Sequence, residues 1–142
     1  MKKIKNKPNI ILIGAGGHAR SCIDVIEQNG KFIIVGLTGT QEELDNELMG
    51  YPIVGTDSDL PDLAKKYEHA IITVGQIQSS TLRQSLYKKA ADLGFILPSI
   101  ISPFAHVSCH AEIGTGSIIL HGSIVNANSW LLIDSSILFN EW

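Results

Sequence analysis

Residues 99–137 read SIISPFAHVSCHAEIGTGSIILHGSIVNANSWLLIDSSI, and an aliphatic side chain returns at every sixth position of this stretch. The aliphatic positions are Ile101, Val107, Ile113, Ile119, Val125, Leu131 and Ile137. A small residue stands two positions before each of them: Ser99, Ala105, Ala111, Ser117, Ser123, Ser129 and Ser135. Neither the helix period of about 3.6 residues nor the two-residue strand period produces a strict six. The pattern predicts the hexapeptide repeats of a parallel β-helix, whose short faces each turn one aliphatic side chain inward.

The part of the chain before this stretch alternates strand and helix signals. Apolar runs predict strands at residues 10–13, 32–35, 53–54 and 70–74, and helices are expected between the first glycine cluster and Gly30, at 59–67 and at 81–93. In the last helix, the four-residue spacing of Leu82, Leu86 and Ala90 predicts the buried face. Such alternation indicates a small parallel sheet covered by helices. Pro98 marks the change of pattern, so we expect an α/β domain at residues 1–97 and the start of a β-helix at 98–142.

Composition excludes several classes of function. The chain has 142 residues, 44% of them hydrophobic, which suffices for one good core or for two small cores that share an interface. The net charge is −3 and the early lysines form only a short tail, so nucleic acid is not an expected partner. No apolar stretch approaches the ~20 residues that span a bilayer, and we expect a cytoplasmic protein. Cys22 and Cys109 are too few for a disulfide framework and are expected to be reduced.

A glycine-rich loop, GAGGHA at residues 14–19, follows the first predicted strand and opens the first predicted helix. Glycine lets backbone amides approach an anion closely, and the helix N-terminus adds partial positive charge. The candidate anion-binding residues are therefore Gly14, Gly16, Gly17 and His18. The helix dipole disfavours the protonated form of His18, which is expected to act as a neutral hydrogen-bond partner. The alternative is a tight turn that packs the helix on the sheet.

The loop also fits the dinucleotide fingerprint of Rossmann folds, which demands an acidic residue at the end of the second strand for the ribose hydroxyls. That place holds Leu37, Thr38 and Gly39, and the nearest acids are Glu42 and Glu43. A diphosphate ligand is compatible with this sequence, whereas a nicotinamide cofactor is not favoured.

Three motifs in order, GAGGHA, TVGQ at residues 73–76 and the C-terminal hexads, resemble the bacterial sugar acetyltransferases of the sialic-acid and bacillosamine type (NeuD/PglD-like). The resemblance extends over nearly the whole chain from Asn9 onward. It implies a Rossmann-like domain followed by a left-handed parallel β-helix, and assembly as a homotrimer. It also implies transfer of an acetyl group from acetyl-CoA to an amine or hydroxyl of a sugar, often one carried on UDP.

The resemblance implies roles for particular residues. The glycine loop with His18 would meet the phosphates of a nucleotide sugar, and Gly75 and Gln76 would form a second loop at that site. Leu37 and Thr38 stand where relatives carry acids that contact the nucleotide, which favours a free sugar acid over a uridine-linked sugar. Asn126 matches an active-site asparagine, with a corner residue of unusual backbone angles as the alternative.

Arg83 could reach an anion, although a solvated helix face is the simpler expectation for it. Both expectations rest on the position of Arg83 in the helix predicted at 81–93, because Arg83 belongs to none of the motifs.

The chemistry requires a general base, and the resemblance places the family's histidine about four residues beyond Trp142. The chain is therefore expected to be a truncated member that lacks most acetyl-CoA-binding coils and does not catalyse acetyl transfer. His121 is a weak substitute base. With coils of 18 residues, as the resemblance implies, His106, Cys109, His110 and His121 point to different faces, so no metal site is expected. The alternatives are a non-catalytic sugar-nucleotide binding or assembly module and an NAD(P)-linked oxidoreductase.

Overall fold

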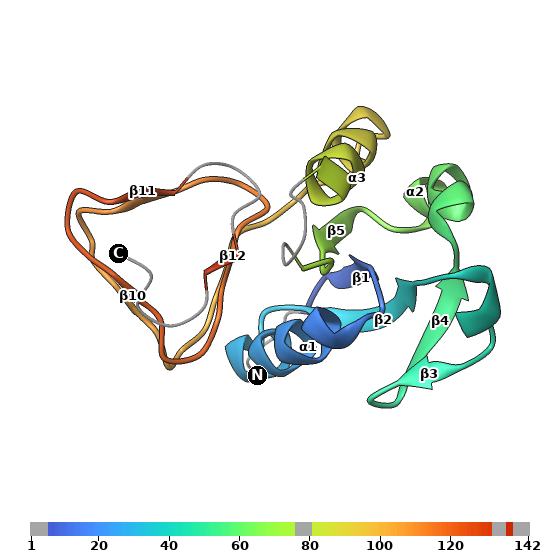
Figure 1. The fold of residues 1–142 in the computed structure, drawn as a ribbon, viewed down its shortest axis with the longest axis horizontal. Coiled ribbons are helices and arrows are strands. Elements are labelled where there is room, and N and C mark those ends of the chain that lie inside the picture. The colour runs from blue at the N-terminus through green and yellow to red at the C-terminus, as the bar shows by residue number, and fades with distance from the viewer. Residues whose placement is uncertain (1–5, 76–80, 132–135, 138–142) are drawn as a thin grey trace.

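The computed structural model of the chain describes residues 6–75, 81–131 and 136–137. Figure 1 shows two parts side by side: a twisted sheet with helices on both of its faces, and a coil with a triangular outline. None of the helices in the described ranges is long and apolar enough to cross a membrane.

A five-stranded sheet with the order β3-β4-β2-β1-β5 forms the centre of the N-terminal part. Four strands are parallel: β1 (Asn9–Ile13), β2 (Ile33–Thr38), β4 (Tyr51–Gly55) and β5 (His69–Ile72). The short strand β3 (Glu47–Leu48) pairs antiparallel with β4 and was not expected from the sequence. The two residues of β3, Glu47 and Leu48, do not form the kind of apolar run by which the other strands were found.

Helices cover both faces of the sheet because successive residues of β1 point to opposite sides. Ile10 and Leu12 pack with helix α1 (Gly17–Asn29) in one apolar cluster. Ile11 and Ile13 pack in a second cluster with helices α2 (Leu60–Lys66) and α3 (Thr81–Asp92). Two short 3-10 turns, η1 (Gln41–Glu43) and η2 (Asp57–Asp59), complete the connections. The expected parallel α/β sheet is confirmed.

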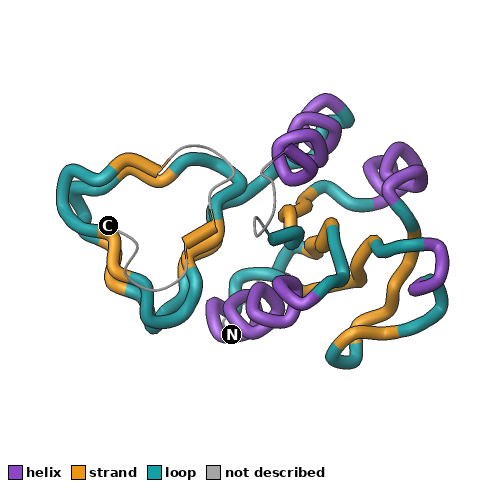
Figure 2. The backbone as a smooth tube through the Cα atoms, viewed as in Figure 1, coloured by secondary structure: helices purple, strands orange, loops and turns teal. Residues whose placement is uncertain are grey.

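The six-residue pattern winds as a parallel β-helix, as predicted (Figure 2). Its strands are β6 (Ile100–Ile101), β7 (His106–Val107), β8 (Glu112–Ile113), β9 (Ile118–Ile119), β10 (Ile124–Val125), β11 (Trp130–Leu131) and β12 (Ser136–Ile137). Each pairs in parallel with the strand 18 positions away: β6 with β9, β7 with β10, β8 with β11 and β9 with β12. One coil therefore takes three hexads, one for each face.

The aliphatic residues of the hexads fill the inside of the coil. Ile119, Val125 and Leu131 form a buried cluster, against which Val107 and Ile113 of the preceding coil pack. The side chain of Ile137 lies outside the described residues.

Three corners of the coil have a left-handed backbone, with φ of 73° at Gly116, 76° at Gly122 and 63° at Asn128. Glycine and asparagine tolerate this region, which explains why these residues recur six positions apart.

One face of the β-helix packs directly on the N-terminal part. Ile100, Ile118 and Leu120 belong to the same apolar cluster as Cys22 and Ile26 of α1. The Asn29 side-chain amide also donates a hydrogen bond to the Ile101 carbonyl at 3.0 Å. The two parts thus share a continuous core instead of being joined by a linker alone.

Candidate functional site

The first glycine of the loop is required by packing. Gly14 has a φ of 123°, and a Cβ built on it would lie 2.7 Å from Val74 Cγ2. Its N–H donates to the Thr38 carbonyl at 3.2 Å, so the loop is tied to the end of β2. Gly14 therefore has the packing of a tight turn between sheet and helix.

Gly16 and Gly17 differ from Gly14 because packing does not require them to be glycine. Both are exposed, and a Cβ on either would have no described atom within 4 Å. Gly16 caps α1 without a side-chain hydrogen bond to the amides of the first turn. The first-turn N–H groups carry the positive end of the helix dipole, so this open backbone suits an anionic ligand.

The second loop lies against the first, as expected for two halves of one site. It follows β5, and the Thr73 hydroxyl donates a hydrogen bond of 2.6 Å to the Gly14 carbonyl. A Cβ on Gly75 would lie 3.4 Å from the Cβ of His18. The structure therefore brings Gly14, His18 and Gly75 together, while Gln76 lies outside the described residues.

His18 stands on the first turn of α1 and is partly buried. Burial lowers the pKa of its imidazole below the ordinary value of 6.5, and the charge of Arg83 lowers this pKa further. The ring is therefore neutral at pH 7. The pKa is shifted downward, which is the direction that the helix dipole predicts. The causes are burial and a nearby cation, neither of which the sequence indicated.

Arg83 corrects two expectations about α3. It lies in the interior with no exposed surface, so it is not on a solvated helix face. Arg83, Leu86 and Ala90 form the buried face, whereas Leu82 is 54% exposed. The spacing 83, 86, 90 fits a helix as well as 82, 86, 90, and hydrophobicity alone selected the wrong first member.

The guanidinium of Arg83 is held by the end of β5. Its Nη1 donates to the carbonyls of Ile72 at 3.1 Å and Val74 at 2.9 Å. Sequence reasoning named Arg83 as able to reach an anion but missed its burial beneath this site. The available signal was an arginine on the apolar side of a helix that follows a glycine-containing loop.

The end of β2 lacks the carboxylate that a nicotinamide dinucleotide requires. Thr38 is fully buried there, and its hydroxyl has no hydrogen-bond partner in the described part of the chain. Glu43, one of the nearest acids, accepts the Thr40 N–H at 3.0 Å in a capping box of η1. The carboxylate of Glu43 is thus engaged within η1.

Histidines of the β-helix do not gather into a metal site. Within the described ranges, no group of three His, Cys, Asp or Glu side chains is placed to hold a metal ion. His106 and His110 are exposed.

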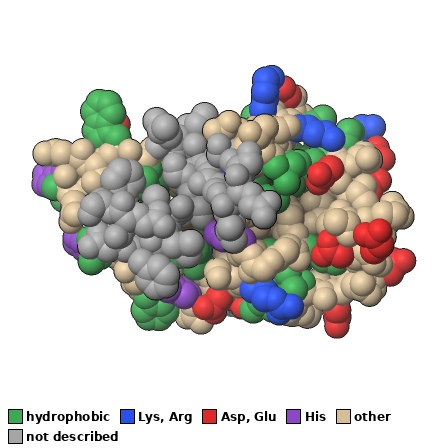
Figure 3. Space-filling view, in the orientation of Figure 1, with side chains coloured by type: hydrophobic (Ala, Val, Ile, Leu, Met, Phe, Trp, Pro, Cys, Tyr) green, Lys and Arg blue, Asp and Glu red, His purple; other side chains and the backbone are tan. Residues whose placement is uncertain are grey.

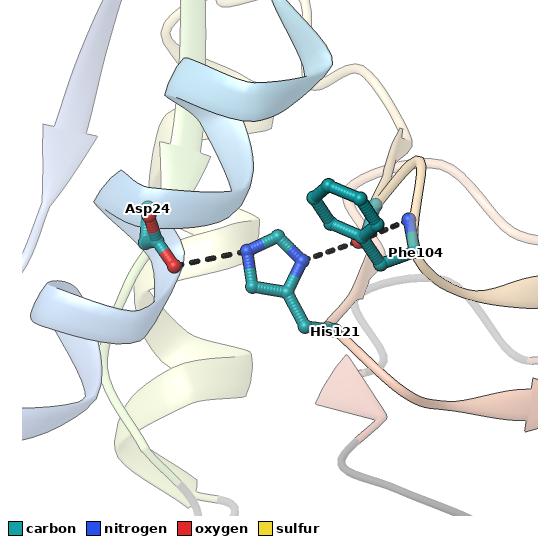
Figure 4. A network of polar contacts seen from close by, with 4 residues as sticks. Asp24, Phe104 and His121 are labelled. Atoms are coloured by element: carbon teal, nitrogen blue, oxygen red, sulfur yellow. Dashed lines mark hydrogen bonds and ion pairs between the residues drawn. The ribbon is translucent and has the colours of Figure 1, made fainter.

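His121 instead joins the two parts of the molecule (Figure 4). Its Nε2 lies 3.0 Å from an Asp24 carboxylate oxygen on α1, and its Nδ1 contacts the Ser102 hydroxyl, which accepts the Phe104 N–H at 2.9 Å. Both ring nitrogens thus have partners, and through them His121 links α1 to the β-helix.

Asn126 directly follows β10, on a different face of the β-helix from the one that packs on α1 (Figure 1). It is exposed, and the corner with positive φ is Asn128. The reading of Asn126 as a strained corner residue is therefore wrong. Within this chain the structure does not bring Asn126 to the glycine loops.

Comparison with known proteins gives a family match and related structures. The PglD N-terminal domain family matches residues 9–90. A search of curated proteins found no match.

Two solved structures resemble the chain over most of its length. A point mutant of perosamine N-acetyltransferase from Caulobacter crescentus, in complex with CoA and GDP-perosamine, is 30% identical, with a TM-score of 0.83 over 92% of this chain and 60% of that one. The acetyltransferase domain of PglB from Neisseria gonorrhoeae, in complex with acetyl coenzyme A, is 28% identical, with a TM-score of 0.80 over 94% of this chain and 62% of that one. The chain thus spans less than two thirds of the length of these relatives.

Proposed function

The chain belongs to the PglD N-terminal domain family, and we propose that its glycine loops bind the nucleotide-linked amino sugar that an acetyl-CoA-dependent N-acetyltransferase modifies. The observation that carries this proposal is that the glycine loop and the residues after β5 meet at one helix N-terminus. Gly16 and Gly17 are exposed there, and Gly75 lies against His18. Such an arrangement suits the diphosphate of a nucleotide sugar.

The choice of acceptor follows from the same site. The sequence favoured a free sugar acid because acids are missing at the end of β2. The C. crescentus perosamine N-acetyltransferase binds GDP-perosamine, a nucleotide-linked amino sugar, and this supports a nucleotide-linked acceptor instead. The backbone amides of the glycine loop would recognise the diphosphate of such a ligand. The neutral His18 would contribute a hydrogen bond to the ligand but no ionic interaction.

Acetyl-CoA is the proposed co-substrate. The structures of the C. crescentus perosamine N-acetyltransferase and of the PglB domain hold CoA or acetyl coenzyme A, and their fold matches this chain with TM-scores of 0.80 to 0.83. In the reaction, the sugar amine forms an amide bond to the acetyl carbon, the thioester of acetyl-CoA breaks, and a base accepts the proton that the amine loses. We assign acceptor binding to the described residues and assign the base to none of them.

We propose a homotrimer for the assembled protein. The β-helix exposes large apolar side chains, with Phe104 64% and Trp130 73% exposed, which offers anchors for a second copy. Figure 3 shows isolated hydrophobic groups on the β-helix side, whereas acidic side chains gather on the opposite side of the N-terminal part. Light scattering coupled to gel filtration measures the molar mass of the assembly, and the mass of a monomer would contradict the trimer.

A cytoplasmic location remains a prediction from the sequence alone.

Calorimetric titration with GDP-perosamine, a UDP-linked amino sugar, free sialic acid and NADH tests the proposed acceptor. We expect binding of at least one nucleotide-linked sugar and no binding of NADH. Tight NADH binding without nucleotide-sugar binding would support the NAD(P)-linked oxidoreductase instead. Binding of sialic acid alone would indicate that the acceptor is a free sugar acid. A thiol-release assay with acetyl-CoA and the bound sugar then measures transfer, and binding without transfer would indicate a binding module.

A further inference from the structure

Arg83 is the largest of the fully buried side chains and carries a charge. A buried cation is costly unless its donors are satisfied, so its position needs a physical reason. It lies on α3 directly beneath the end of β5, where the second loop of the candidate site begins.

The guanidinium links three segments of the site. Its Nη1 donates to the carbonyls on both sides of Thr73, and the Thr73 hydroxyl donates to the Gly14 carbonyl. Movement of α3 away from β5 would therefore release Thr73 and, through it, the first glycine of the loop. Gly14 also lies in tight contact with Val74. The two loops are therefore packed on each other, and Arg83 of α3 binds the second of them.

The charge of Arg83 also acts on the site through space. Interior charges are screened less by salt and water than surface charges. Burial lowers the pKa of His18 on the first turn of α1, and the charge of Arg83 lowers it further. A ligand with a diphosphate at that turn would gain from this charge, whereas a neutral sugar would not.

We propose that Arg83 is the positioning residue of the diphosphate subsite, fixing the two glycine loops together and selecting an anionic ligand without touching it. This inference rests on the proposed function. The proposed function assigns the preference for diphosphate to backbone amides alone. This inference adds the buried side chain of Arg83.

Two substitutions separate the charge from the hydrogen bonds. Arg83→Lys keeps the charge, and Arg83→Gln keeps N–H donors for the carbonyls but removes the charge. Lys88→Gln is the matched control, because Lys88 lies on the same helix with an exposed side chain paired to Asp92. UDP and GDP are the calorimetric probes, and thermal unfolding followed by circular dichroism establishes that each variant is folded at the titration temperature.

We expect Arg83→Gln to weaken diphosphate binding by about tenfold or more, Arg83→Lys by less than about threefold, and Lys88→Gln not measurably. Arg83→Gln binding as tightly as the wild type, or Arg83→Lys losing as much as Arg83→Gln, would overturn the inference. A wild-type protein that binds neither UDP nor GDP would instead remove the proposed function itself.

If Arg83→Gln does not fold, an NMR titration of His18 in the wild type and in a folded Arg83→Met variant decides. Burial lowers the pKa of His18 in both proteins, so we expect the pKa to be higher in Arg83→Met than in the wild type because only the charge is lost. Equal His18 pKa values in the two proteins would show that the charge does not act on the loop.

Discussion

At the scale of single residues, the glycine loop contains glycines that serve two different purposes. Gly14 has a backbone conformation and a close neighbour that exclude a side chain, whereas Gly16 and Gly17 face open space in the described structure. The sequence presents all three as one motif. Only their surroundings separate the glycine that maintains the fold from the glycines left open to a ligand.

Alanine substitutions at these positions should therefore separate stability from binding. We expect Gly14→Ala to lower the free energy of unfolding by about 2 kcal/mol or more, through strain at positive φ and contact with Val74. Gly16→Ala should change it by less than about 0.5 kcal/mol, yet weaken nucleotide-sugar binding because its Cβ enters the open face. Urea unfolding and calorimetric titration measure the two effects. Equal loss of stability in both variants would contradict this division.

His18 gives the fold a dependence on pH with a definite sign. Its pKa in the folded protein lies below the ordinary 6.5, so the unfolded chain takes up the proton first on acidification. His18 should therefore cost no stability above about pH 6.5, and the free energy of unfolding should fall as the pH drops from there through the lowered pKa. We expect the difference between wild type and His18→Gln to follow this course in urea titrations. A difference that stays constant from pH 7.5 to 5 would contradict it.

At the scale of secondary-structure elements, the corners of the β-helix determine where special residues are needed. Each coil turns three times, and the left-handed corners at Gly116, Gly122 and Asn128 keep the six-residue spacing. An asparagine at such a corner looks in the sequence like the asparagine two positions earlier. Only the backbone angles assign the corner to Asn128.

Matched valine substitutions at the two asparagines test this assignment. A β-branched side chain is strained in the left-handed region, so Asn128→Val should destabilise the protein by about 1–2 kcal/mol. Asn128→Gly should be neutral or slightly stabilising, since glycine takes this conformation freely. Asn126→Val, the same chemical change at ordinary φ, is the stability control. A lower unfolding temperature for Asn126→Val than for Asn128→Val would show that the left-handed corner is not at Asn128.

At the scale of the whole molecule, the packing of α1 on one face of the β-helix makes the two parts interdependent. Ile118 on this face is fully buried against the N-terminal part, and the His121–Asp24 contact lies beside it. Six positions later, Ile124 occupies the matching outward position on the next face and is 37% exposed. The division near Pro98 remains a prediction about sequence pattern, while the core extends across it.

Substitution of these two isoleucines should show whether the shared core carries stability. We expect Ile118→Ala to lower the free energy of unfolding by about 2–5 kcal/mol and Ile124→Ala by less than about 1 kcal/mol. The helix signal in circular dichroism and the fluorescence of the two tryptophans, Trp130 and Trp142, should give the same transition midpoint, because the parts unfold together. Two separate midpoints in the wild type would mean that each part is stable alone.

The sequence by itself determined the main helices, the parallel strands and the β-helix, because the six-residue repeat, the apolar strands and the glycine caps are local patterns set by backbone geometry. It did not indicate the short strand β3. The resemblance of its motifs to a known family also placed Gly14, His18 and Gly75 in one candidate site. Only the tertiary structure decided that Arg83 is buried beneath that site and that His121 joins the two parts. Both depend on contacts between residues distant in sequence, such as the 97 positions between Asp24 and His121, and no local pattern records which side chains such contacts bring together.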